Sequence, residues 1–253
     1  MKKHRSRFIG LCVSLLLGLL PVAAHAGWLD ILNKNTTSSN AAPAGLTSLT
    51  QGEMYDGLKQ ALSKGVQQAV ANLGHDGGYL NNLDVKIPVP DSLKRVQQAA
   101  HAVGQDKIAD EFIATMNHAA EQAVPQAAAI FGDAITKMNV DDAKAILGGS
   151  DDAATQYFRK TSEAQLTEKM LPIVKQATEK TGVTAAYEQL MQHGGSITQF
   201  MGQQNAVDLD GYVTGKALDG LFKMVAAEEK NIRQNPVARS TDVLKKVFGT
   251  KLQ

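Results

Sequence analysis

A helical spacing of apolar residues dominates the chain from about residue 47 onward and limits what it can fold into. It follows the stretch "TQGE", which has the form of a capping box: Thr50 and Glu53 each satisfy a backbone N–H of the other. The apolar positions of this first segment are Met54, Leu58, Leu62, Val66, Val70 and Leu73. Gly74 then supplies a helix stop. A helix with one apolar face predicts packing against other helices.

The same spacing returns along the rest of the chain, with caps before it and glycine or proline after it. Pro125 separates patterns at 106–123 and 126–138, which leaves open two helices or one helix with a kink. Pro172 interrupts another pattern, at 162–181. Further patterns lie at 184–193, at about 209–235 and at 240–249. The sequence therefore predicts an all-α fold, a multi-helix bundle of about nine helices.

One stretch is not helical in pattern, namely "HDGGYLNNLDVKIPVP" at 75–90. Its first half is rich in Gly and Asn, which are typical of turns. In its second half Val85, Ile87 and Val89 alternate with other residues and two prolines, which favours an extended chain outside the middle of a sheet. We predict a turn followed by an extended, Pro-rich strap over about 79–90. A calcium site is not predicted, because the alternating acidic residues and closing glutamate of a calcium loop are missing.

The first 26 residues have the parts of a secretory signal peptide. "MKKHRSR" is positively charged, "FIGLCVSLLLGLLPVAA" is apolar, and "AHA" is a small-x-small cleavage sequence. We predict a signal peptide at 1–26, cleavage after Ala26 and a periplasmic location, with an uncleaved membrane anchor as the alternative. No transmembrane span is predicted after cleavage, since no later run approaches the roughly 20 apolar residues that a spanning helix needs.

The predicted mature chain has two parts. Residues 27–46 are small and polar after a short apolar start, and we predict a flexible amino-terminal segment. Residues 47–253 are predicted to form a single helical domain. Trp28 could make a peripheral membrane contact, although loose docking on the domain or disorder is the plainer interpretation.

Charge and cysteine content exclude several classes of function. Four basic residues and no acidic residue lie in the predicted signal, which leaves 22 basic and 25 acidic residues and a net charge of −3. A mildly acidic chain argues against nucleic-acid binding, which depends on clustered Lys and Arg. The only cysteine, Cys12, belongs to the predicted signal, so the mature chain has no thiol chemistry and no disulfide.

The stretch "MNHAAEQAVP" places His118 and Glu121 three residues apart on one helical face. Helical metal sites use such pairs, but in multiple copies and with further glutamates. Because the pair occurs once, we predict two neighbours in a scaffold and no metal site. No nucleophile elbow, phosphate loop or dinucleotide motif is present, so the sequence predicts no catalytic residues and no cofactor.

Two further polar pairs have helical i,i+4 spacing, Thr155 with Arg159 and Glu229 with Arg233. Such pairs can belong to a solvated helical face, where each contributes little. The alternative prediction is that Arg159, Arg233 and Arg239 meet Glu121 and Glu229 in a half-buried network, with Asn117 filling the remaining hydrogen bonds. Such a network would hold the bundle together or bind an anionic ligand. We favour the structural role, because structural ion-pair networks resemble binding sites.

Four separated motifs resemble the bacterial domain-of-unknown-function family 4197, namely "MNHAAEQAVP", "AATQYFRKT", "GYVTGKALDGLF" and "EEKNIRQNPVARSTDVLKKVFG". The resemblance covers about residues 46 to 249 in order. It implies a secreted or envelope-associated helical protein of Gram-negative bacteria, and it implies no activity. The family pattern falls on Asn117, Glu121, Thr155, Tyr157, Arg159, Glu228, Glu229, Arg233, Asn235, Pro236 and Arg239.

Three functions stay open at this point. The first is a non-enzymatic binding or interaction module of the cell envelope, with an unknown envelope protein or small ligand as partner. The second is a small-molecule or lipid carrier, whose apolar cavity would use the many methionines. The third is a hydrolase-type enzyme with Glu121 or Glu229 as base. We favour the first.

Overall fold

The fold is all-helical throughout the part of the chain that the structure describes. This part of the computed structural model comprises residues 50–102, 104, 106–181, 208–235, 245 and 247. It contains no β-strand. The predicted signal peptide, Trp28 with the segment 27–46, and Arg239 lie outside the described residues.

Seven α-helices and two short 3-10 helices make up the described part. The α-helices are α1 (Gln51–Leu73), α2 (Lys94–Ala102), α3 (Asp106–Ala123), α4 (Ala127–Lys137), α5 (Val140–Gly148), α6 (Ala153–Thr181) and α9 (Leu209–Gln234). The 3-10 helices are η1 (Asp91–Leu93) and η2 (Val124–Gln126). These residues confirm the all-α class but do not support the predicted count of about nine helices.

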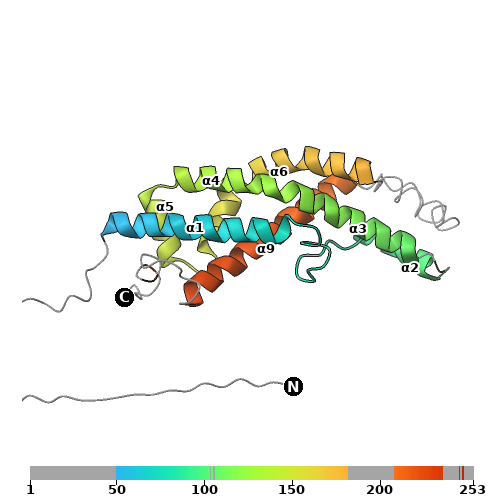
Figure 1. Cartoon of the computed structure of the whole chain (residues 1–253), viewed down its shortest axis with the longest axis horizontal. Helices are drawn as coiled ribbons and strands as arrows, with labels where there is room; N and C mark the ends of the chain where they lie inside the picture. The colour runs from blue at the N-terminus through green and yellow to red at the C-terminus, as the bar shows by residue number, and fades with distance from the viewer. Residues whose placement is uncertain are drawn as a thin grey trace, which may run out of the picture. The chain divides into compact units, whose positions relative to one another are not determined.

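Two prolines have different effects on the described helices. At Pro125 the chain forms η2, so α3 and α4 are separate helices, which follow one another in Figure 1. At Pro172 no break occurs, and α6 is one helix of 29 residues. Leu166, Met170 and Val174, on either side of Pro172, are fully buried, so core packing supports the helix on both sides of Pro172 despite the missing N–H. The predicted helices at 184–193 and 240–249 lie outside the described residues.

The caps predicted from the sequence are present at two helix starts. At α1, Glu53 N donates to Thr50 Oγ1 at 3.2 Å and Thr50 N donates to Glu53 Oε2 at 2.8 Å, which completes the capping box. At α5, Asn139 and Asp142 form the same reciprocal pair. Each box satisfies backbone N–H groups that have no partner inside the helix.

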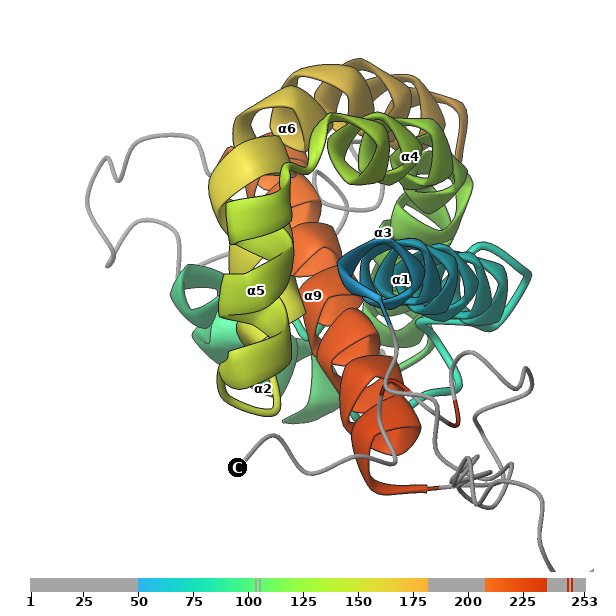
Figure 2. The same ribbon diagram turned by 90° about the vertical axis from the view of Figure 1, so that its left-hand side faces the viewer.

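Helix α9 packs against α1, α3 and α6, and Figure 2 shows it running between α5 and α1. Its apolar face is buried in one continuous core together with those of its neighbours. Three phenylalanines join α4, α6 and α9: the ring centroids of Phe131 and Phe158 are 4.9 Å apart, and those of Phe131 and Phe222 are 6.0 Å apart. This aromatic cluster contributes packing beyond its buried area.

The connection between α1 and η1 is not helical, as predicted, but its turns continue to residue 85, further than the predicted start of the strap at about residue 79. Residues 86–90 follow without helix, turn or strand. Tyr79, Val85, Ile87 and Val89 are buried against the core. The turn needs glycine, because Gly77 has a φ of +84°, in the left-handed region. We call residues 75–90 the strap loop.

Candidate functional site

The candidate residues form separate groups in the structure instead of the single network that we expected. Asn117 and Glu121 of α3 face the strap loop. Thr155, Glu229 and Arg233 meet where the start of α6 packs against α9. The two groups therefore join different pairs of segments.

Glu121 fastens the first part of the strap loop to α3. Its carboxylate is 4% exposed, and Oε1 accepts the N–H of Tyr79 at 2.9 Å and the N–H of Leu80 at 3.0 Å. Oε2 lies 2.7 Å from Nδ1 of His118. A buried carboxylate is stable only when donors surround it, and here two of the donors are loop backbone.

Asn117 fastens the second part of the same loop. Its Oδ1 accepts the N–H of Ile87 at 2.8 Å, and its Nδ2 donates to the carbonyl of Ile87 at 2.9 Å. Nδ2 also donates to the carbonyl of Ile113, one turn earlier in α3, at 2.8 Å. The side chain is fully buried and thus replaces the sheet partner that an extended segment would otherwise need.

Helix α9 holds the strap loop from the other side. The Tyr79 hydroxyl donates to the carbonyl of Ala217 at 2.6 Å, and the Tyr212 hydroxyl donates to the carbonyl of Pro88 at 3.0 Å. Lys223 Nζ donates to the carbonyl of Asp84 at 2.7 Å. Burial, with a smaller contribution from the negative charge of Glu121, raises the pKa of the Tyr79 phenol well above its ordinary value.

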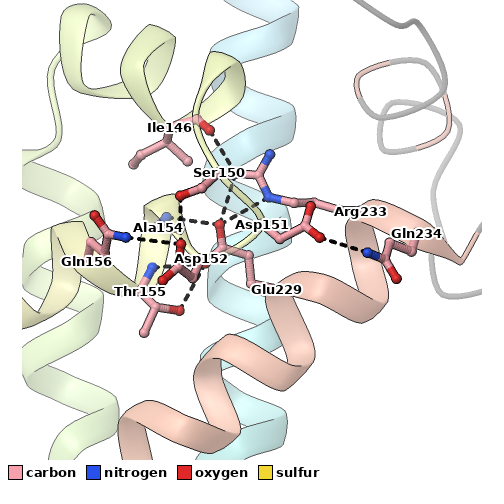
Figure 3. A network of polar contacts seen from close by, with 10 residues as sticks. All are labelled: Ile146, Ser150, Asp151, Asp152, Ala154, Thr155, Gln156, Glu229, Arg233 and Gln234. Atoms are coloured by element: carbon pink, nitrogen blue, oxygen red, sulfur yellow. Dashed lines mark hydrogen bonds and ion pairs between the residues drawn. The ribbon is translucent and has the colours of Figure 1, made fainter.

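Glu229 caps α6 although it belongs to α9 (Figure 3). Its Oε1 accepts the N–H of Ala154, and its Oε2 accepts both the N–H and the Oγ1 hydroxyl of Thr155, each at 2.9 Å. The first N–H groups of a helix lack partners inside the helix and carry partial positive charge. A buried carboxylate is therefore stable at this point.

Arg233 completes this group by pairing with Glu229 one turn away. Its Nη2 lies 2.9 Å from Glu229 Oε1 and donates to the carbonyl of Ile146 near the end of α5 at 2.7 Å. The arginine and glutamate side chains are 12% and 6% exposed. One ion pair thus joins α9 to the end of α5 and to the start of α6.

Tyr157 and Arg159 lie outside both groups. The Tyr157 hydroxyl donates to the carbonyl of Ala134 at 3.2 Å, and burial raises its pKa. Arg159 pairs with Glu163 at 3.2 Å and with Asp219 at 3.9 Å, and its guanidinium carbon lies 4.4 Å from the Phe222 ring centroid. The prediction that Arg159 meets Glu121 and Glu229 is therefore wrong. The competing carboxylates at 163 and 219 lie closer on the same exposed surface.

The structure also adds a residue that the sequence did not single out. Asp76, in the strap loop, places Oδ1 3.2 Å from His118 Nδ1. Asp76, His118 and Glu121 each offer a potential metal-ligand atom, and these atoms all lie within 4.8 Å of one another. No helical spacing could have indicated this contact, because the aspartate precedes its partners by more than forty residues and lies in a turn.

A surface hollow of about 360 Å³ opens over these three residues. It is lined by Gly74, His75, Asp76, His118, Glu121, Gln122 and Pro125. The hollow thus exposes imidazole, carboxylate and amide groups, which can bind a cation or a polar ligand.

Three of the methionines that suggested a carrier cavity are packed in the core. Met116 and Met170 have no exposed surface, and Met138 is 2% exposed. All three belong to the continuous apolar core. Their flexible side chains fill gaps between helices, as methionine commonly does.

Comparison with known proteins identifies a family and no function. Among the described helices, none combines the length and the apolar character needed to cross a bilayer. Neither a curated protein nor a solved structure matches the chain significantly. Residues 48–249 match the family described as a protein of unknown function, DUF4197, as the sequence motifs predicted, and the chain therefore belongs to that family.

Proposed function

We propose that the protein is an exported, non-enzymatic interaction module of the Gram-negative cell envelope and that the strap loop is its recognition element. The predicted signal peptide at 1–26, with cleavage after Ala26, supports the periplasmic location. The observation that carries the interaction role is the way in which α3 and α9 fix the strap loop from two sides.

Five side chains form the hydrogen bonds that fix the strap loop. Glu121, Asn117 and Lys223 bind backbone groups of residues 79, 80, 84 and 87, and the hydroxyls of Tyr79 and Tyr212 add two more bonds. A loop that only connects two helices does not need five side chains to hold its conformation. A loop fixed in one conformation loses little entropy when it binds a partner. Binding residues are often found on loops that a rigid scaffold positions.

The fixed loop also presents an apolar side chain to solvent. Leu83 is 92% exposed, whereas its loop neighbours Val85 and Ile87 are buried. Asp84, next to it, is held by Lys223 through its carbonyl and its carboxylate. An exposed leucine on a preorganised loop is a suitable anchor for a protein partner with a small apolar pocket.

The alternatives have weaker support. A general base needs an oxygen free to take a proton from a substrate, but both carboxylate oxygens of Glu229 accept backbone N–H groups. In Glu121, Oε1 accepts two backbone N–H groups and Oε2 lies against the His118 imidazole. A lipid carrier needs a lined cavity, and Met116, Met138 and Met170 fill the core instead. We therefore place both below the interaction role.

The test is site-specific photo-crosslinking in the intact envelope of the native host. A photo-reactive residue replaces exposed Lys86 in the strap loop, and a control replaces Leu171 on α6, which is 38% exposed. We expect one discrete crosslinked protein from position 86, lost when Leu83→Ser is added, and none from position 171. Equal labelling from both positions, or labelling at 86 that survives Leu83→Ser, contradicts the proposal.

A further inference from the structure

We propose that Asp76, His118 and Glu121 form a binding site for a divalent transition-metal ion of the zinc class. This inference replaces our expectation from the sequence that His118 and Glu121 are only scaffold neighbours. It does not depend on the proposed interaction role, because it concerns a different part of the loop and a different ligand.

The first argument is convergence on one nitrogen. His118 Nδ1 lies 2.7 Å from Glu121 Oε2 and 3.2 Å from Asp76 Oδ1. An imidazole nitrogen carries at most one hydrogen, so it cannot satisfy both carboxylates with full hydrogen bonds. Two carboxylates beside one imidazole also leave an excess of negative charge. A divalent cation between the three atoms removes both problems.

The two distances from His118 Nδ1 are close to those that a bound zinc ion needs. Tetrahedral zinc binds nitrogen and oxygen at about 2.0–2.2 Å, so two of its ligand atoms lie about 3.4 Å apart. The separation of 3.2 Å between His118 and Asp76 already fits. The separation of 2.7 Å between His118 and Glu121 needs to increase by a few tenths of an ångström, which a rotation of the half-buried imidazole can supply.

The second argument is that Glu121 is oriented in advance. Its Oε1 is occupied by the N–H groups of Tyr79 and Leu80, which turns Oε2 toward the hollow. Ligand carboxylates in metal sites are commonly held by such outer hydrogen bonds, which lower the cost of assembling the site. The carboxylate is also 4% exposed, so its field acts on a bound cation through protein instead of water.

The third argument is access. The hollow of about 360 Å³ over the three residues is open to solvent, and His75 and Gln122 also line it. A metal ion can therefore enter, and water or a neighbouring side chain can take the remaining coordination position. One imidazole with two carboxylates favours zinc or a related transition metal over calcium and magnesium, which prefer six or more oxygen ligands.

The chain offers a matched control. His101 also contacts a carboxylate, that of Asp106, on the exposed surface at the end of α2 and the start of α3. Among the described residues, this pair has no buried third carboxylate within ligand distance. His101→Ala should therefore leave the proposed site intact, while His118→Ala and Asp76→Asn should remove it. Asp76 is 92% exposed, so Asp76→Asn removes a ligand without disturbing the core.

The experiment is titration of the full-length, chelator-treated protein with Zn²⁺ by calorimetry, and with Co²⁺ by its visible absorption. We expect the wild type and His101→Ala to bind one equivalent more than Asp76→Asn and His118→Ala, or to bind the same equivalent at least 10-fold more tightly. Even the loss of an outer hydrogen-bond partner of a ligand costs about 10–100-fold in metal affinity. Only the wild type and His101→Ala should show the visible absorption bands of Co²⁺ bound with a low coordination number. Equal isotherms in all four proteins, or a loss caused by His101→Ala, overturn the proposal.

Thermal unfolding supplies a second measurement. An ion that binds only the folded state, present at 100 times its Kd, shifts the unfolding equilibrium about 100-fold toward the folded protein. Zn²⁺ should therefore raise the Tm of the wild type and of His101→Ala, but not that of Asp76→Asn. If His118→Ala does not fold, Asp76→Asn alone decides, and a Tm rise that is unchanged in Asp76→Asn contradicts the site.

Discussion

Glu229 caps the backbone of Thr155, a residue 74 positions earlier in the chain. Its carboxylate accepts the Thr155 N–H and hydroxyl at 2.9 Å while it pairs with Arg233 on its own helix. Both side chains of the ion pair are nearly buried. The contact therefore joins α6 to α9, and removing either partner of the ion pair leaves an uncompensated charge inside the protein.

Arg233→Met should destabilise the protein strongly. The change leaves the buried Glu229 carboxylate without its cation, and breaking a buried pair from one side costs about 3–5 kcal/mol. The free energy of unfolding in urea is the measurement. Arg159→Met is the control, because the ion pairs of Arg159 are exposed and such pairs contribute about 0–1 kcal/mol. Equal losses in the two variants would contradict the structural role of Arg233.

Asn117→Ala should loosen the strap loop before it unfolds the bundle. Ile87 loses both of its backbone hydrogen bonds to α3, and an unsatisfied buried group costs about 1–3 kcal/mol. Amide hydrogen exchange at Ile87 should accelerate more than exchange in the middle of α1. Asn72→Ala, whose side chain bonds only to Gln68 on the surface of α1, should leave the Ile87 amide unchanged.

Phe158→Ala should weaken the packing of α4, α6 and α9 together. The ring is fully buried and lies 4.9 Å from Phe131, centroid to centroid. Truncation of a buried phenylalanine costs about 3–5 kcal/mol, because the cavity refills only partly. Phe158→Leu should cost clearly less. A loss below about 1 kcal/mol for the alanine variant would show that the aromatic cluster is not central to the core.

Tyr79→Phe should change how stability depends on alkaline pH. Burial raises the pKa of the folded Tyr79 phenol above the ordinary value of 10.0, so the folded state holds this proton more tightly than the unfolded state does. The resulting stability is full below pH 10 and is lost as the pH rises from there toward the folded pKa, at up to about 1.4 kcal/mol per pH unit.

The measurement is urea unfolding of the wild type and Tyr79→Phe from pH 9 to pH 11. The variant lacks the bond to the Ala217 carbonyl at every pH, so it should be less stable at pH 9. The difference between the two proteins should narrow above pH 10. Parallel curves would contradict a buried phenol with a raised pKa.

The elements that sequence predicted well are those fixed by neighbours in the chain. The capping boxes at Thr50 and Asn139 involve partners three residues away, and the apolar face of α1 repeats every three or four residues. The predicted interruption at Pro172 is absent, because proline is a local signal and burial of the residues around it is a tertiary effect. Packing of α6 on the core decides that position, and one sequence does not show it.

In the candidate site, too, contacts between chain neighbours were predictable and contacts between distant segments were not. Glu229 with Arg233 was predictable, since both lie on one helix, but the cap on Thr155 depends on how α6 meets α9. Asp76 was missed because a turn residue has no periodicity that points to His118. Helical spacing in the sequence therefore identified the polar side chains of the site, but their contacts with other segments follow only from the fold.

Glu229→Gln tests most directly whether the buried carboxylates serve the scaffold. The amide must place its NH₂ group against backbone N–H donors or against Arg233, so we predict a loss of at least about 2 kcal/mol in the free energy of unfolding, with faster exchange of the Thr155 amide. Replacing a strained active-site group often leaves stability unchanged or raises it. Unchanged or increased stability of Glu229→Gln would therefore contradict the scaffold role.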